Sequence, residues 1–348
     1  MRIKNIFSTL LIVVMMFTLA GCNTADETGN NANGSGKNNS DTINIKLAGQ
    51  SPEDHPSTQA LYDFAEKVNE KTDGRVKIKV YPANQLGDYT TVFEEVGRGT
   101  IEMALIGLPG NQDKRLELIF TPYMVSSYEG IEERYGPDSY VFNKIQEITD
   151  ELGVKLLAFH ANGFGGVGTS KEINNLLDLG SDKDILLRTA PLDVFQQPMK
   201  DIGFRTVTIP FADLYTALQT GSADGWAGGE PSLNYFGFRD VINYFYQTND
   251  FFNADSFLIN SEVYESFSEE DRLVINEAAT ELMNNSFETA KNYDEKYRNL
   301  LEEKGIEVIE FSEEELDQIA EFVRENTWPK LEDSLGDGII DSLTKELK

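Results

Sequence analysis

The sequence contains very little cysteine and histidine. Cys22 is the only cysteine among 348 residues, so the chain can form neither an intramolecular disulfide nor a cysteine-rich metal site. The two histidines, His55 and His160, lie far apart in the sequence and have no partner at the spacing of a metal site or of a nucleophile with its base. The glycine-rich stretch 163–168 lacks the Gly-Lys-Ser/Thr ending of a phosphate-binding loop. The sequence therefore predicts no metal, no cofactor and no enzymatic activity.

Basic residues are scarce as well. The chain has 30 Lys and Arg against 59 Asp and Glu, which gives a formal net charge of −29. This balance excludes nucleic acid as a partner, because binding to a phosphate backbone depends on clustered basic residues. So acidic a chain also repels anions at long range. Any anion site on it must therefore be local and well focused.

Long hydrophobic runs are missing except at the N-terminus. A basic head, Met1–Lys4, precedes an apolar run from Ile6 to Ala20, which is shorter than the roughly twenty residues of a membrane-spanning helix. Residues 1–21 are therefore predicted to be a secretory signal peptide. The Leu-Ala-Gly-Cys sequence that ends at Cys22 resembles the lipobox of bacterial lipoproteins. This resemblance implies cleavage before Cys22, acylation of Cys22, and an extracytoplasmic protein anchored to the cell membrane by lipid.

Residues 22–42 consist mainly of Asn, Gly, Ser, Asp and Thr and contain almost no apolar side chains. A segment of this composition buries too little surface to fold. We expect it to be a flexible tether.

Beyond residue 42 the hydrophobic pattern is typical of an α/β fold. Strands are predicted at 43–48, 76–81, 101–106, 154–159, 185–188, 205–209 and 306–310, and helices at 55–71, 90–98, 192–202, 211–219, 268–301 and 312–331. Beyond Asn249 the pattern predicts helix almost to the end of the chain. Two α/β lobes joined by long helices are expected: lobe I at 43–161 plus about 250–290, and lobe II at 162–249 plus about 291–348.

Three stretches resemble the DctP family of TRAP-transporter binding proteins, and the resemblance extends from Ile43 to about Leu331. They are Lys71–Ile78 followed by Tyr81-Pro82 and Gln85–Gly87, then Gly99–Met103, and then Asp213–Gly221 followed by Asp224-Gly225. The resemblance implies a two-lobe fold like that of periplasmic binding proteins, also called a Venus flytrap, with long C-terminal helices bridging the lobes. It also implies capture of a small organic acid by hinge closure, for uptake through the membrane subunits of a TRAP permease.

Arg188 is the strongest candidate for a ligand contact. It ends an apolar strand and precedes a turn at Pro191, where its planar guanidinium can hold a carboxylate with two parallel hydrogen bonds. In the family, the arginine at this strand end is the carboxylate clamp. The alternative is a surface ion pair with one of the many acidic residues.

Further contacts are implied by position in the family. Trp226 and Phe211 are candidates for stacking on an apolar ligand, and Glu230, Gln50 and Asn253 for polar contacts; a structural role is the alternative for each. Family members that bind sialic acid carry a second arginine where this chain has Gly165. A single clamp suggests a monocarboxylate, or an acid whose other end meets neutral donors.

Other functions remain open at the level of sequence. The same cleft would serve a binding lipoprotein that works with a sensor kinase or with another transporter. A secreted hydrolase would need a nucleophile or paired acids in the cleft, and with 59 acidic residues such pairs arise by chance. A purely structural surface lipoprotein would have no cleft.

Overall fold

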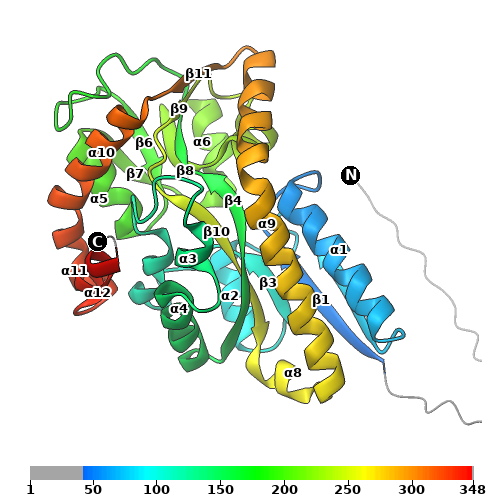
Figure 1. Cartoon of the computed structure of the whole chain (residues 1–348). Helices are drawn as coiled ribbons and strands as arrows, with labels where there is room; N and C mark the ends of the chain where they lie inside the picture. Colours follow the sequence, from blue (N-terminus) through cyan, green and yellow to red (C-terminus); the bar gives the residue numbers. More distant parts are fainter. Residues whose placement is uncertain (1–41, 347–348) are drawn as a thin grey trace, which may run out of the picture. The chain divides into compact units, whose positions relative to one another are not determined.

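The computed structural model describes residues 42–346 (Figure 1). The predicted signal peptide, Cys22 and all but the last residue of the predicted tether lie outside the described residues. Within 42–346, no helix combines the length and the apolar character needed to cross a membrane.

The first of two β-sheets has five strands in the order β2-β1-β3-β10-β4. Strands β1, β2 and β3 run parallel, and β10 is antiparallel to both of its neighbours. The strands are β1 (Ile43–Gly49), β2 (Val76–Tyr81), β3 (Met103–Ile106), β4 (Val154–Phe164) and β10 (Phe252–Asn260).

The second sheet has six strands in the order β11-β9-β5-β8-β6-β7. Strand β5 is antiparallel to β8 and β9, and the other pairs are parallel. The strands are β5 (Gly166–Thr169), β6 (Leu186–Thr189), β7 (Arg205–Thr208), β8 (Gly225–Gly229), β9 (Tyr244–Gln247) and β11 (Glu307–Glu310).

Helices cover both faces of each sheet. They are α1 (Pro56–Lys71), α2 (Tyr89–Gly97), η1 (Lys114–Phe120), α3 (Ile131–Tyr135), α4 (Tyr140–Glu151), α5 (Asp193–Ile202), η2 (Phe211–Asp213), α6 (Leu214–Thr220), α7 (Pro231–Leu233), η3 (Asn234–Phe238), α8 (Ser261–Ser266), α9 (Glu269–Glu303), α10 (Glu313–Asn326), α11 (Trp328–Leu335) and α12 (Ile339–Glu346). Alternate side chains of a strand point to opposite faces. Accordingly, Leu47 of β1 packs in one core with α1 and α9, while its neighbour Ala48 packs in another with α2, α4 and η1.

Three segments connect the two sheets. Strand β4 of the first sheet passes into β5 of the second at Gly165, and β9 of the second passes into β10 of the first through residues 248–251. Helix α9 is the third, and Figure 1 shows it running alongside both sheets. Its Leu282 is buried in the core of the first sheet and its Leu301 in the core of the second. The two-sheet α/β fold spanned by a long helix is confirmed.

Two predictions from the pattern are wrong. The chain beyond Asn249 first forms strand β10, whose residues are all buried, so the polar–apolar alternation of a half-exposed strand is missing there. The helix predicted at 312–331 is two helices that meet at Thr327. Pro329 lies in the first turn of α11, where its missing N–H is tolerated, whereas it would interrupt a continuous helix.

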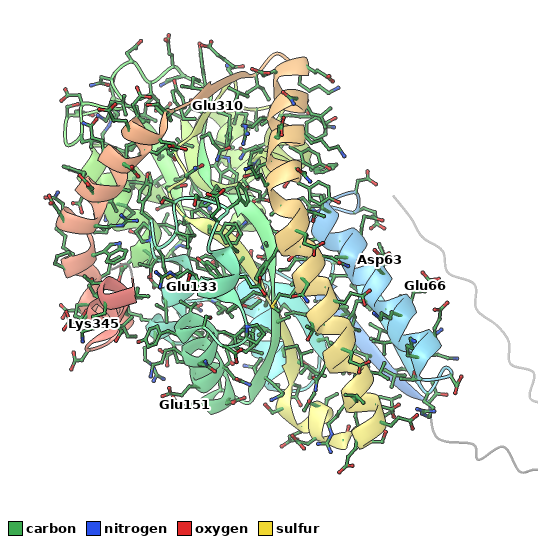
Figure 2. The ribbon with its side chains drawn as sticks, in the orientation of Figure 1. Asp63, Glu66, Glu133, Glu151, Glu310 and Lys345 are labelled. Atoms are coloured by element: carbon green, nitrogen blue, oxygen red, sulfur yellow. The ribbon has the colours of Figure 1, made fainter. Side chains whose placement is uncertain are left out.

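Exposed acidic side chains surround the fold. Figure 2 labels Asp63 and Glu66 on α1, Glu133 on α3, Glu151 on α4 and Glu310 on β11, all of which are exposed. The net negative charge therefore lies on the surface, around elements that cover both sheets.

Candidate functional site

A cavity lies where side chains of the two sheets meet. Its polar lining comes from Gln50, which follows β1, from Asn253 and Asp255 on β10, and from Arg188 on β6. The first three belong to the first sheet and its connections, and Arg188 belongs to the second. Including its open mouth, the cavity holds about 580 Å³ of space free of atoms.

Six aromatic rings form a large part of the remaining wall. They come from five separate elements and from the 248–251 connection, and they are Tyr89, Phe120, Phe195, Phe211, Trp226 and Phe251. Phe195 packs edge-on against Phe251 with ring centroids 4.8 Å apart and lies 5.4 Å from the ring of Phe120. A wall of packed rings favours a ligand with an apolar body.

Arg188 is a buried cation without an acidic partner. Its side chain is 3% exposed, and its Nε donates to the Ile209 carbonyl over 2.8 Å. No carboxylate of the described residues lies within 4 Å of its guanidinium. Burial lowers its pKa to about 10, although the charges of Tyr89 and Asp88 act in the opposite direction. The alternative of a surface ion pair is therefore wrong, and the guanidinium lines the cavity with its terminal nitrogens available for an anion.

Glu230 does not line the cavity but lies behind Asn253. Its side chain is 1% exposed and accepts from Asn253 Nδ2 over 2.7 Å, while His55 Nε2 lies 3.3 Å from its other oxygen. Ser232 Oγ also donates to that oxygen over 3.2 Å. Burial opposes ionisation of Glu230, but its hydrogen bonds with His55 and Asn253 and the charge of His55 outweigh burial and lower its pKa. Glu230 thus fixes the amide of Asn253 at the cavity wall.

Gln50 and Asp255 form a second fixed group. The Gly107 N–H donates to Gln50 Oε1 over 3.1 Å, so the amide nitrogen of Gln50 points the other way and donates to Asp255 Oδ1 over 3.0 Å. Asp255 is 1% exposed, and burial raises its pKa to about 7.

The predicted contacts are thus largely brought together. Arg188, Gln50, Asn253, Phe211 and Trp226 line one cavity. Trp226 is only 2% exposed and donates from Nε1 to Asn234 Oδ1 over 3.0 Å, so it has a structural role as well.

Asp255 and four of the rings, Tyr89, Phe120, Phe195 and Phe251, were not predicted from the sequence. Asp255 had no local signal, because it is one of four polar residues among the nine that form β10. No isolated signal marked the rings, because 21 phenylalanines and 14 tyrosines are spread along the chain. In the part of the chain that the structure describes, no group of three or more acidic or histidine side chains is arranged to hold a metal ion.

Proteins of similar sequence include solute-binding proteins. The sialic acid-binding periplasmic protein SiaP of Vibrio cholerae is 22% identical over 247 residues, covering 70% of this chain and 76% of that protein.

Solved structures share the fold. The sugar acid binding protein DctPAm of Advenella mimigardefordensis, in complex with galactonate, superposes with a TM-score of 0.79 at 22% identity, covering 87% of this chain and 97% of that one. A TRAP periplasmic solute-binding protein of Desulfovibrio salexigens with bound orotic acid gives a TM-score of 0.78 at 21% identity, covering 88% and 97%.

A family model matches most of the chain, from residue 47 to residue 331. Its description is "Bacterial extracellular solute-binding protein, family 7". The chain therefore belongs to the DctP family of bacterial extracellular solute-binding proteins.

Proposed function

We propose that this protein captures a small organic acid outside the cytoplasmic membrane and delivers it to a TRAP permease, with Arg188 holding the carboxylate. One observation carries the proposal: a guanidinium that is 3% exposed, has no acidic partner and faces a cavity. A buried cation is unfavourable unless it is paired, so this site is built for an anion that comes from outside the chain. Galactonate and orotic acid, bound by the two proteins of similar fold, are both organic acids.

The mechanism is closure of two walls on the ligand. Arg188 lies on the wall formed by the second sheet, and Gln50 and Asn253 lie on the wall formed by the first. A ligand that contacts both walls favours the conformation in which they are close, by the difference between its affinities for the two conformations. The segments that connect the sheets would bend, and the lobes would be those expected from the sequence, 43–161 plus about 250–290 and 162–249 plus about 291–348.

The membrane attachment belongs to the same proposal. Cleavage before Cys22 and acylation of that residue would anchor the protein, and residues 22–42 would let the binding domain reach the permease. Metabolic labelling with a radioactive fatty acid tests the anchor. Wild type should be labelled, and Cys22→Ala should be released unlabelled; labelling of the variant would contradict the anchor.

Ligand capture is tested by a thermal-shift screen of the purified protein against small carboxylates, sugar acids and amino acids. Ligand at a hundredfold its dissociation constant should add about 2.7 kcal/mol to the free energy of unfolding. The shift should disappear in Arg188→Met, which keeps the length of the side chain but not its charge.

Arg205→Met is the matched control. Arg205 lies on the neighbouring strand β7 and forms an exposed ion pair with Asp184, outside the cavity. Ligand shifts should persist in this variant. Shifts that persist in Arg188→Met, or no shift with any acid in wild type, would overturn the proposal.

A further inference from the structure

Asp255 is a buried carboxylate without a cationic partner. It is 1% exposed, and within residues 42–346 no lysine, arginine or histidine nitrogen lies within 4 Å of its oxygens. Its two hydrogen bonds come from neutral amides, Gln50 Nε2 at 3.0 Å and Asn162 Nδ2 at 2.9 Å. A carboxylate oxygen has room for more than one hydrogen bond. Asp255 therefore lines the cavity with acceptor capacity that the chain leaves unused.

Both neighbouring amides are locked in orientation. Gln50 is held by the Gly107 N–H, and Asn162 Oδ1 lies 3.0 Å from His160 Nδ1. Because Asn162 Nδ2 is directed at Asp255, its Oδ1 accepts a hydrogen bond from His160 Nδ1–H. Neither amide can turn away without losing a partner, so the Asp255 carboxyl is held in place by neutral groups alone.

Asn253 adds a second acceptor to this wall. Its amide nitrogen is committed to Glu230, which as a carboxylate only accepts. With Nδ2 oriented toward Glu230, the Asn253 amide oxygen faces away from that carboxylate and can accept a hydrogen bond from a ligand. The first-sheet wall offers acceptors at both Asp255 and Asn253.

The cavity thus contains two ionisable side chains on opposite walls, and neither has a partner of opposite charge. Arg188 on the second sheet lacks an anion, Asp255 on the first sheet lacks a cation when it is ionised, and the two do not pair with each other. A buried charge without a partner is unfavourable, and one ligand with a negative and a positive group can supply both partners.

This inference rests on the proposed function: we propose that the ligand is a zwitterion with an apolar body, whose carboxylate is held by Arg188 and whose positively charged nitrogen is held by Asp255 and Asn253. The aromatic walls fit both the body and the nitrogen, because ring faces attract organic cations. A zwitterion also carries no net charge, so the negative field of the protein does not repel it.

Matched ligand pairs test this inference by calorimetric titration. The pairs are leucine with 4-methylpentanoate, phenylalanine with 3-phenylpropanoate, and proline with cyclopentanecarboxylate; each pair differs at the nitrogen. In wild type, the amino member of at least one pair should bind about 10- to 100-fold more tightly, as expected for a hydrogen bond to a charged group. This comparison needs no variant.

Asp255→Asn should reduce that preference to near one by weakening only the amino member. Asp271→Asn is the control, because Asp271 is also buried but lies in the first turn of α9, pairs with Arg75 and does not line the cavity. The preference should survive in this control.

The outcomes separate the two proposals. Equal or weaker binding of the amino members, with binding lost in Arg188→Met, overturns the zwitterion and leaves acid capture standing. A preference that persists in Asp255→Asn overturns the role of Asp255. If no acid binds, or if binding survives in Arg188→Met, both proposals fall.

Discussion

Arg188 illustrates how a binding residue can destabilise the free protein. Its charge is buried, yet the chain supplies one backbone carbonyl and no carboxylate to compensate it. Apolar replacements of buried ionic groups are often neutral or stabilising, because burial of a charge is unfavourable. The function of Arg188 and the stability of the unliganded fold are therefore expected to oppose each other.

Arg188→Met should accordingly leave the free energy of unfolding of the unliganded protein unchanged or raise it by about 1–4 kcal/mol. Urea unfolding followed by circular dichroism measures this. Arg205→Met, on the exposed side of β7, should stay within about 0.5 kcal/mol of wild type. A large loss of stability in Arg188→Met would mean that the arginine is primarily structural.

Asp294 is a second buried residue whose side chain is only partly satisfied by hydrogen bonds within the described structure. Tyr128 and the Phe164 N–H donate to its Oδ2, while Oδ1 has no partner in the described structure. Burial raises its pKa to about 7, above the value of about 3.9 in an unfolded chain. Between these values the folded state holds a proton that the unfolded state has released. The contribution of Asp294 to stability is therefore greatest below pH 4 and declines as the pH rises through 7.

Asp294→Asn should remove this pH-dependent loss of stability, because asparagine does not titrate. Compared with wild type, the variant should be relatively more stable at pH 8 than at pH 5, as measured by urea unfolding at both values. The exposed Asp63→Asn serves as a control for the loss of one surface charge. The same difference between Asp294→Asn and wild type at both pH values would show that Asp294 does not titrate in this range.

At the scale of elements, the β4–β5 connection depends on a glycine. A Cβ atom on Gly165 would lie 2.3 Å from Phe251 Cε1 and 2.8 Å from Asp250 Oδ1. Both neighbours belong to the other strand connection, so the two segments that join the sheets pack directly against each other at this point. A side chain there would push the two connections apart.

Gly165→Ala should therefore lower the free energy of unfolding by about 1–3 kcal/mol, the range for overpacking a close-packed site. Gly237→Ala is the control, since a Cβ atom there meets nothing within 4 Å. It should change stability by less than about 0.5 kcal/mol. Equal stability of the two variants in urea would contradict the close packing of the connections.

Some elements carry clear local signals in the sequence and others do not. Strand β2 was predicted because the turn at Asp73-Gly74 precedes it. Strand β10 was missed because both of its faces are buried, and β8 because its sequence, Gly-Trp-Ala-Gly-Gly, resembles a loop. Local patterns cannot identify strands whose stability comes from neighbours distant in sequence.

The whole molecule brings together site residues that the sequence keeps apart. Gln50 and Asp255, which are 205 positions apart, share a hydrogen bond. The resemblance to a family suggested Arg188, Gln50 and Asn253 by position, and the cavity contains all three. Asp255 and most of the rings could be assigned to the cavity only once the two sheets were placed in space.

Net charge is also a property of the whole molecule. Because 59 acidic side chains face 30 basic ones, repulsion should destabilise the fold at low ionic strength. Raising NaCl from about 0.05 M to about 1 M shortens the Debye length to roughly 3 Å and should raise the melting temperature. A variant with Asp63, Glu66, Glu133 and Glu151 changed to their amides should show a smaller rise. A melting temperature independent of salt would contradict this account.

The central claim is that Arg188 recognises a carboxylate. Calorimetric titration of wild type with the tightest-binding acid from the screen and with its primary amide tests this most directly, because the two ligands differ only in that group. The amide should bind at least about 30-fold more weakly, since loss of one partner of a buried charged pair costs about 2–5 kcal/mol. Equal affinity for the acid and the amide would contradict the assignment of Arg188 as a carboxylate clamp.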